Sequence, residues 1–198
     1  MNKEINLFIR ENFYKYLDSY NSKKYPFELY SEFRSSFAEL QPSKNDIENA
    51  INWKYGNLNK SNSPNVHKAI ICKIIELWPN FATSESINSD HETFLWWKNH
   101  LTNDKAKRFV TVSFITHLVH FKSDFPIIDQ HNFRAMNFML NSFKFNPSFK
   151  KSPSNWEDVQ MLKSFINEIS KTHVLKQGDI DKFLMMYGKE LKKQLKCL

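Results

Sequence analysis

Apolar residues recur every three or four positions along most of the chain, which is the spacing of one face of an α-helix. Residues 3–20 show it first, with Ile5, Phe8, Ile9 and Phe13 on one face. No alternation of apolar and polar residues extends beyond a few positions, so the pattern predicts an all-α fold. It predicts further helices over residues 43–56, 63–79, 91–100, 102–121, 129–140, 155–172 and 179–196, with loops over 82–90 and 144–155.

Residue types at the expected helix ends support several of these boundaries. Ser43 and Asp46 have the spacing of a capping box, and Gly56 suits the left-handed conformation that ends many helices. Pro79 is expected to end the third helix, because proline cannot donate a helical hydrogen bond. The last helix is expected to be capped by Asp179 or Asp181.

Composition narrows the class of protein further. A length of 198 residues suits one domain, with two small helical lobes as the alternative. Only three glycines occur, which disfavours turn-rich β-sandwiches and glycine-dependent nucleotide folds. Two distant cysteines fit reduced intracellular thiols better than a disulfide scaffold or a zinc finger. With no secretory signal and no apolar run of membrane-spanning length, we expect a cytoplasmic protein that does not enter a membrane.

The net charge of +7 favours a polyanionic partner, most often nucleic acid. The charge alone does not name that partner, since many Lys- and Asn-rich soluble proteins are mildly basic without binding DNA. The cationic end of the chain, residues 189–196, is expected to be a solvated helical tail, with a DNA-binding arm as the alternative.

The segment of residues 125–136 carries the clearest candidate chemistry. It delivers one acid, Asp129, from an apolar run that ends in Ile128 into the start of a helix. A carboxylate at a helix start most often caps the backbone amides there. The same geometry would fix a catalytic carboxylate, which could stabilise a sugar cation and orient an attacking water. The residues alone leave both interpretations open.

The run from Ile128 to Arg134, together with His117, His120 and Phe121 upstream, resembles the helix-hairpin-helix DNA glycosylase superfamily, in its oxidised-guanine branch. The resemblance is centred on residues 113–140. It implies a two-lobed helical bundle that binds duplex DNA and everts one base, with Asp129 as the catalytic carboxylate. His131 and Arg134 would brace the aspartate loop, meet the base or bind phosphate. The resemblance implies no metal and no organic cofactor, and we expect a monomer.

Two features depart from this family. The family's hairpin binds DNA phosphate through glycine-flanked amides, but no glycine occurs between Gly56 and Gly178. A degenerate hairpin would have to bind phosphate through side chains instead, with helix capping and a solvated face as the alternative. The candidate residues are Thr102, Asn103, Lys105, Lys107 and Arg108.

The second departure concerns the lysine with which lyase members of the family form a Schiff base. The matching position holds Thr116-His117, and an imidazole cannot form that imine. Lys122 lies too close to Asp129 to be an obvious substitute. An enzyme of this kind would release the base and leave an abasic site.

Several other side chains are candidates for the substrate pocket. His117 would help to recognise the base or protonate the leaving group, and Phe114 lies one turn before it. One of Trp96 and Trp97 would face the pocket or the DNA, although tryptophans in helical proteins are usually core residues. His117 and His120 share a helix face, but a structural role for His120 is preferred to half of a metal site.

The sequence therefore predicts a monofunctional DNA N-glycosylase, with modified bases of phage DNA as one candidate target in antiviral defence. A catalytically inactive DNA-binding module on the same fold is the alternative. A third interpretation is a helical protein–protein adaptor in which the aspartate motif is fortuitous.

Overall fold

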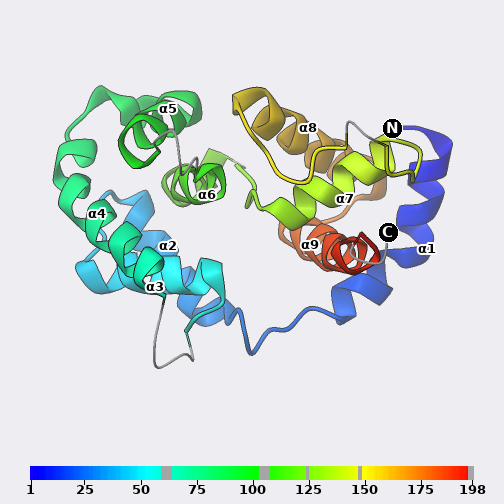
Figure 1. Cartoon of the computed structure of the whole chain (residues 1–198), viewed down its shortest axis with the longest axis horizontal. Coiled ribbons are helices and arrows are strands. Elements are labelled where there is room, and N and C mark those ends of the chain that lie inside the picture. Colours follow the sequence, from blue (N-terminus) through cyan, green and yellow to red (C-terminus); the bar gives the residue numbers. More distant parts are fainter. Residues whose placement is uncertain (59–63, 103–107, 124, 147–148, 196–198) are drawn as a thin grey trace. The chain divides into compact units, whose positions relative to one another are not determined.

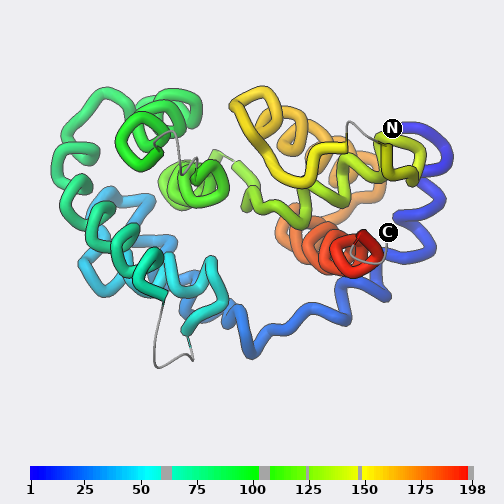
Figure 2. The backbone as a smooth tube through the Cα atoms, in the orientation of Figure 1, coloured from blue at the N-terminus to red at the C-terminus, as the bar shows by residue number. Residues whose placement is uncertain are grey.

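A computed structural model describes residues 1–58, 64–102, 108–123, 125–146 and 149–195. These residues form nine α-helices, two short 3-10 helices and no strand, which confirms the predicted all-α class (Figure 1). The chain divides into two compact units (Figure 2). Unit 1 comprises residues 1–20 and 126–198, and unit 2 comprises residues 21–125. None of the helices in these described ranges is long and apolar enough to cross a membrane.

Unit 1 is built around its last helix. Helix α9 packs against each of the other three helices of the unit. Its apolar face, with Phe183, Leu184 and Leu191, is fully or almost fully buried. The helices of unit 1 are α1 (Lys3–Asp18), α7 (Gln130–Leu140), α8 (Trp156–His173) and α9 (Gln177–Gln194).

Unit 2 is built around α6, which is apolar on nearly every side. Every residue from Thr111 to Leu118 is buried, and α6 packs against α2 and α5. A helix without a polar face belongs in a core, so its few polar side chains need partners inside the protein. The elements of unit 2 are α2 (Phe27–Ala38), α3 (Lys44–Tyr55), α4 (Asn65–Ala82), η1 (Glu85–Asn88), α5 (Asp90–Leu101), α6 (Phe109–Val119) and η2 (Phe121–Ser123).

The capping signals of the helix predicted over residues 43–56 are confirmed. Ser43 and Asp46 form the reciprocal bonds of a capping box at the start of α3. Gly56 ends that helix with φ +63°, in the left-handed region that favours glycine. These signals act over three or four residues, which is why the sequence alone located them.

Helix α2 is absent from the sequence-based prediction. It begins after Pro26 without a side-chain cap, and its exposed Phe27 obscures the apolar pattern. The signal was nevertheless present, because the buried residues Tyr30, Phe33 and Phe37 have helical spacing.

The predicted end of a helix at Pro79 is wrong. Helix α4 continues through Pro79 to Ala82, and the next apolar residue, Phe81, is completely buried. Burial of Phe81 stabilises this last turn by about 2–3 kcal/mol, which is comparable to the effect of a proline. The hydroxyls of Thr83 and Ser84 then donate to the carbonyl oxygens of Pro79 and Phe81.

Two other predicted helix boundaries are also wrong. The helix expected over 102–121 comprises only Phe109–Val119, because Thr102 is the extended residue after α5 and Arg108 adopts φ +41°. Helix α9 begins at Gln177 after Lys176, so neither predicted aspartate caps it. Asp179 instead pairs with Lys182 at 2.9 Å.

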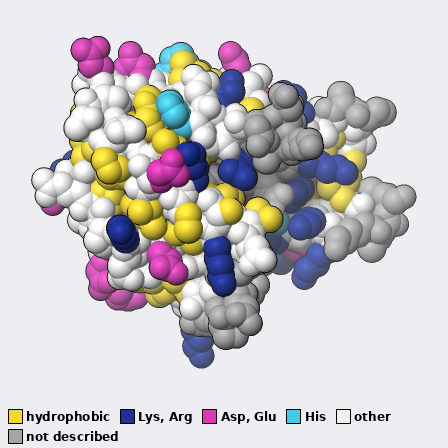
Figure 3. Space-filling view, turned by 60° about the vertical axis from the view of Figure 1, so that its left-hand side comes forward, with side chains coloured by type: hydrophobic (Ala, Val, Ile, Leu, Met, Phe, Trp, Pro, Cys, Tyr) yellow, Lys and Arg dark blue, Asp and Glu magenta, His cyan; other side chains and the backbone are white. Residues whose placement is uncertain are grey.

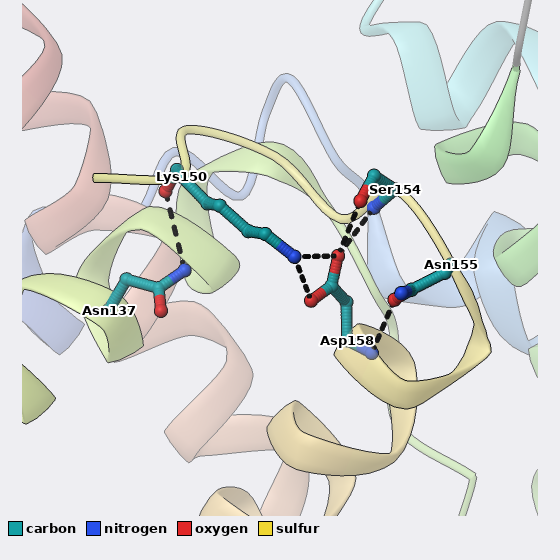
Figure 4. A network of polar contacts seen from close by, with 5 residues as sticks. All are labelled: Asn137, Lys150, Ser154, Asn155 and Asp158. Carbon is teal, nitrogen blue, oxygen red and sulfur yellow. Dashed lines mark hydrogen bonds and ion pairs between the residues drawn. The ribbon is translucent and has the colours of Figure 1, made fainter. Parts of the chain in front are cut away.

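A polar network anchors the loop between α7 and α8, which has no helix or strand in its described residues (Figure 4). The carboxylate of Asp158 accepts hydrogen bonds from Lys150 Nζ at 2.9 Å and from the amide and hydroxyl of Ser154 at 2.8 Å. Asn155 caps α8 through the amide of Asp158, and Asn137 Nδ2 donates to the carbonyl of Lys150. Burial raises the pKa of Asp158, but the bonds from Lys150 and Ser154 outweigh it and hold the pKa below its ordinary value.

Candidate functional site

Asp129 caps α7, as its position in the sequence indicates. Its backbone is extended, and its Oδ1 accepts hydrogen bonds from the backbone amides of His131 and Asn132. The positive end of the helix dipole favours the ionised form of a carboxylate at this place. The acid is half-buried and held in one orientation by the turn that it caps.

Asn132 fixes the segment that carries Asp129. Its Oδ1 accepts a hydrogen bond from the amide of Asp129 at 2.8 Å, and its Nδ2 donates to the carbonyl of Ile127. The amide of Ile127 in turn donates to the carboxylate of Asp181 in α9 at 3.2 Å. Because these bonds tie both sides of Asp129 to neighbouring helices, the acid is prepositioned rather than carried on a loose loop.

A buried cation supports the same turn. Arg134 is 3% exposed, and its Nη1 donates to the carbonyl of Gly188 at 3.0 Å and to His131 Nδ1 at 2.9 Å. Since arginine can only donate, Nδ1 of His131 is the acceptor. Burial lowers the pKa of His131 and of Arg134, whereas the negative charge of Asp129 raises both. The three side chains therefore form one electrostatically coupled group in unit 1.

The geometry favours one of the two roles predicted for Arg134. Its guanidinium faces the protein's own backbone, so it braces the aspartate turn and presents little surface to a phosphate. The bracing role fits this geometry, and the predicted contact of Arg134 with DNA stays a prediction. His131 is half-buried, and its predicted contact with a substrate stays a prediction.

His117 lies in unit 2 with both ring nitrogens engaged. Its Nδ1 pairs with the carbonyl of Phe125, which can only accept, so Nδ1 carries the proton. Its Nε2 therefore accepts from the hydroxyl of Tyr30 at 2.6 Å. Burial lowers the pKa of His117 to about 4, so the ring is neutral at pH 7. In this arrangement neither nitrogen can serve a leaving group without first losing a partner.

The predicted aromatic candidates also belong to unit 2. Phe114 and Trp97 are completely buried, so neither has an open face for a base. Trp97 stacks on Trp78 and packs against the tilted ring of Phe81. Of the two tryptophans, only Trp96 could then face a base or the DNA, and that contact stays a prediction. Trp96 is half-buried and stacks on the exposed His100 at 3.9 Å between ring centroids.

The predicted degenerate hairpin is only partly within the described residues. Thr102 Oγ1 donates to the carbonyl of Lys98, and Arg108 Nη1 donates to the carbonyl of Leu101. Both side chains thus help to end α5. The other predicted phosphate ligands, which lie outside the described residues, are Asn103, Lys105 and Lys107.

His120 is hydrogen-bonded within the protein. Its Nε2 donates to Thr93 Oγ1 at 2.8 Å, and that hydroxyl donates to the carbonyl of Ser86. This geometry confirms the structural role preferred for His120. In the part of the chain that the structure describes, no group of three or more His, Cys, Asp or Glu side chains is arranged to hold a metal ion.

The structure groups the predicted residues differently from the sequence. Asp129, His131 and Arg134 form one cluster in unit 1, whereas His117, Phe114 and the tryptophans belong to unit 2. Sequence reasoning missed the residues that support each cluster, because most of their partners are distant in the chain. They are Arg34, Lys54, Asn132, Asp181 and Gly188. Asn132, whose partners are only three and five residues away, had a local signal as the N3 residue of a capping box.

Comparison of the chain with models of protein families, with curated proteins and with solved structures finds no match. The functional assignment therefore depends on the chemistry of the clusters themselves and on the resemblance at residues 113–140.

Proposed function

We propose that this protein is a monofunctional DNA N-glycosylase of a divergent helix-hairpin-helix type, with Asp129 as its catalytic carboxylate. The observation that carries the proposal is the rigid presentation of this acid. It heads α7, is tied down through Asn132 and Ile127, and lies near the buried cation of Arg134. Such fixed orientation is what electrostatic catalysis needs, because the charge must not reorganise during the reaction.

In the proposed reaction the bond between the sugar and the base breaks, and positive charge develops on the sugar. The carboxylate of Asp129 stabilises that charge and accepts a proton from the attacking water, whose oxygen bonds to the anomeric carbon of the sugar. The base leaves with the electron pair of the broken bond and takes its proton from solvent. The products are a free base and an abasic site. Residues 130–134 act by holding the acid, and we assign no catalytic proton to His117, whose nitrogens are both engaged.

The absence of an amine at the expected lysine position supports hydrolysis without lyase activity. Thr116 and His117 occupy that position, and both are buried in α6. The hydroxyl of Thr116 donates to the carbonyl of Val112. Neither group can form a stable imine with the abasic sugar.

The test is Asp129→Asn, with Asp46→Asn as the matched control. Asparagine is itself a good N-cap, so the substitution removes the charge and keeps the cap. Asp46 also belongs to a capping box, in unit 2, and its replacement changes the net charge equally. We expect base release to fall at least about a hundredfold in Asp129→Asn and to stay unchanged in Asp46→Asn. Base release by Asp129→Asn at the rate of the unmodified protein would refute the mechanism.

A non-catalytic DNA-binding module is the second candidate. The engagement of both His117 nitrogens favours it, because the protein then offers no evident acid at that position. Such a module would bind duplex DNA with strong salt dependence but release no base from any substrate.

We propose enzymatically modified bases, such as those of phage DNA, as the substrate class. The altered lysine position and the missing hairpin glycines argue against a general housekeeping repair enzyme. Modified and unmodified phage genomes should be incubated with the protein and the released bases identified by mass spectrometry. Base release from a modified genome alone would assign the substrate class, and release from neither would favour the binding module.

A further inference from the structure

Arg34, on α2, holds its guanidinium between two aromatic rings. Its Cζ lies 4.3 Å from the centroid of the Phe121 ring and 5.2 Å from that of Tyr30. The hydroxyl of Tyr30 is fixed in turn by His117. Contact with two rings restricts the rotamers of this side chain, so binding of an anion costs little further conformational entropy.

One donor of this guanidinium has no hydrogen-bond partner among the described residues. This donor is Nε, which is buried. None of the ion pairs formed between described residues involves Arg34. Buried donors are nearly always satisfied by protein groups or by water, so the unpaired Nε of Arg34 has capacity for a further hydrogen bond. Planar N–H donors of this kind match the oxygens of a phosphate.

One other cation acts on the same buried histidine as Arg34, because Lys54 and Arg34 both lower the pKa of His117. Lys54 Nζ lies 5.3 Å from the centroid of the Phe114 ring, and Lys122, next to Phe121, is exposed. Figure 3 shows one face of the molecule, on which Lys and Arg side chains lie among hydrophobic and acidic ones. The face in this view is therefore not uniformly basic, and the candidate anion contact rests on the contacts of Arg34 itself.

We infer that Arg34 is a receptor for a backbone phosphate of DNA, with its guanidinium presented by the rings of Tyr30 and Phe121. The inference rests on the proposed function and identifies a phosphate contact that the sequence did not reveal. It also offers a substitute for the missing glycine hairpin, because a stacked guanidinium can bind phosphate without close approach of the backbone.

The test compares Arg34→Met and Arg34→Lys with the control Lys73→Met. Methionine fills the space between two rings and favours aromatic contacts, so it removes the charge and preserves packing. Lys73 lies on α4 in the same unit and pairs with Glu76 at 2.8 Å. Its replacement by methionine removes one positive charge, as Arg34→Met does. Binding of a fluorescent duplex is measured by anisotropy at several salt concentrations, and thermal unfolding verifies that each variant is folded.

We expect Arg34→Met to bind duplex DNA about tenfold more weakly and to reduce the slope of log K against log salt by about 0.9, the effect of one lost phosphate contact. Arg34→Lys should keep most of the slope but lose affinity, because lysine lacks the bidentate fork. Lys73→Met should match the unmodified protein.

Two contrary results have different meanings. If the unmodified protein binds DNA and Arg34→Met shows the same slope and affinity, the inference is overturned and the proposed function stands. If the unmodified protein shows no salt-dependent binding, the proposed function fails and the inference fails with it.

Discussion

The approach of α9 to α7 depends on the absence of a side chain at Gly188. A Cβ built on this residue would lie 1.9 Å from the carbonyl oxygen of His131 and 2.6 Å from its carbonyl carbon. Both are backbone atoms of the turn that Asp129 caps, so no side-chain rotation can relieve the contact. Gly178, in the first turn of the same helix, has nothing within 4 Å of an equivalent Cβ.

These two glycines give opposite expectations for substitution by alanine. An alanine at Gly188 must push the helices apart by more than 1 Å, since ordinary contacts begin near 3.4 Å. Overpacking of this kind costs about 3 kcal/mol, and the better helix propensity of alanine offsets about 1 kcal/mol of it. We therefore expect Gly188→Ala to lower the free energy of unfolding by about 2 kcal/mol. Gly178→Ala should raise it by about 0.5–1 kcal/mol.

Urea and thermal unfolding, followed by circular dichroism, measure both effects. For a chain of 198 residues the expected changes correspond to a Tm lower by about 4–8 °C for Gly188→Ala and higher by about 2 °C for Gly178→Ala. Because the displaced atoms belong to the Asp129 turn, base release should also fall in Gly188→Ala and stay unchanged in Gly178→Ala. A Gly188→Ala protein as stable as the unmodified one would refute the close approach of α7 and α9.

The remaining predictions concern pH. His117 is neutral in the folded protein with a pKa of about 4, whereas an unfolded histidine titrates near 6.5, so unfolding takes up a proton between these values. The contribution of His117 to the free energy of unfolding should be fully present above pH 6.5 and fall by about 1.4 kcal/mol per pH unit towards pH 4. Urea titrations of His117→Gln should lack this pH dependence. Parallel curves of unfolding free energy against pH for the two proteins would contradict a buried neutral ring. Asp158 has a folded pKa below its ordinary value, so its contribution is present above the unfolded pKa of about 3.9 and is lost as pH falls through the folded pKa. Asp158→Asn should therefore cost about 2 kcal/mol at pH 7 and progressively less as pH falls below about 3.9, and a loss that does not change with pH would show that the charge of Asp158 does not matter.

The candidate site illustrates how far local signals reach. The capping role of Asp129 follows from its position before a helix, because the amides that it binds are two and three residues away. The long-range contacts that hold the Asp129 turn in place do not follow from the sequence. Asp181 reaches Ile127 across 54 residues of sequence, and Arg134 reaches Gly188 across the same separation. No spacing rule predicts such pairs, since they depend on how α7 meets α9.

The missed helix α2 had the larger consequence for function. If the segment of residues 27–38 were not a helix, nothing in the sequence would bring Arg34 to an aromatic ring. In α2, helical spacing brings Tyr30 and Arg34 to the same face, and the fold adds Phe121 from a distant segment. Helix α2 also provides the hydroxyl that occupies His117 Nε2 across 87 residues, which alters the role expected of that histidine.

The sequence by itself determined the helical class, the caps at Ser43 and Asp129, and the position of the candidate acid. Those features arise from hydrogen bonds and apolar spacing within a few residues, so a linear pattern records them. Only the tertiary structure decided that Arg134 is buried, that His117 is neutral and doubly bonded, and that Arg34 lies between two rings. Burial and pairing depend on which distant segments pack together, and that packing sets both the charge state and the accessibility of each group.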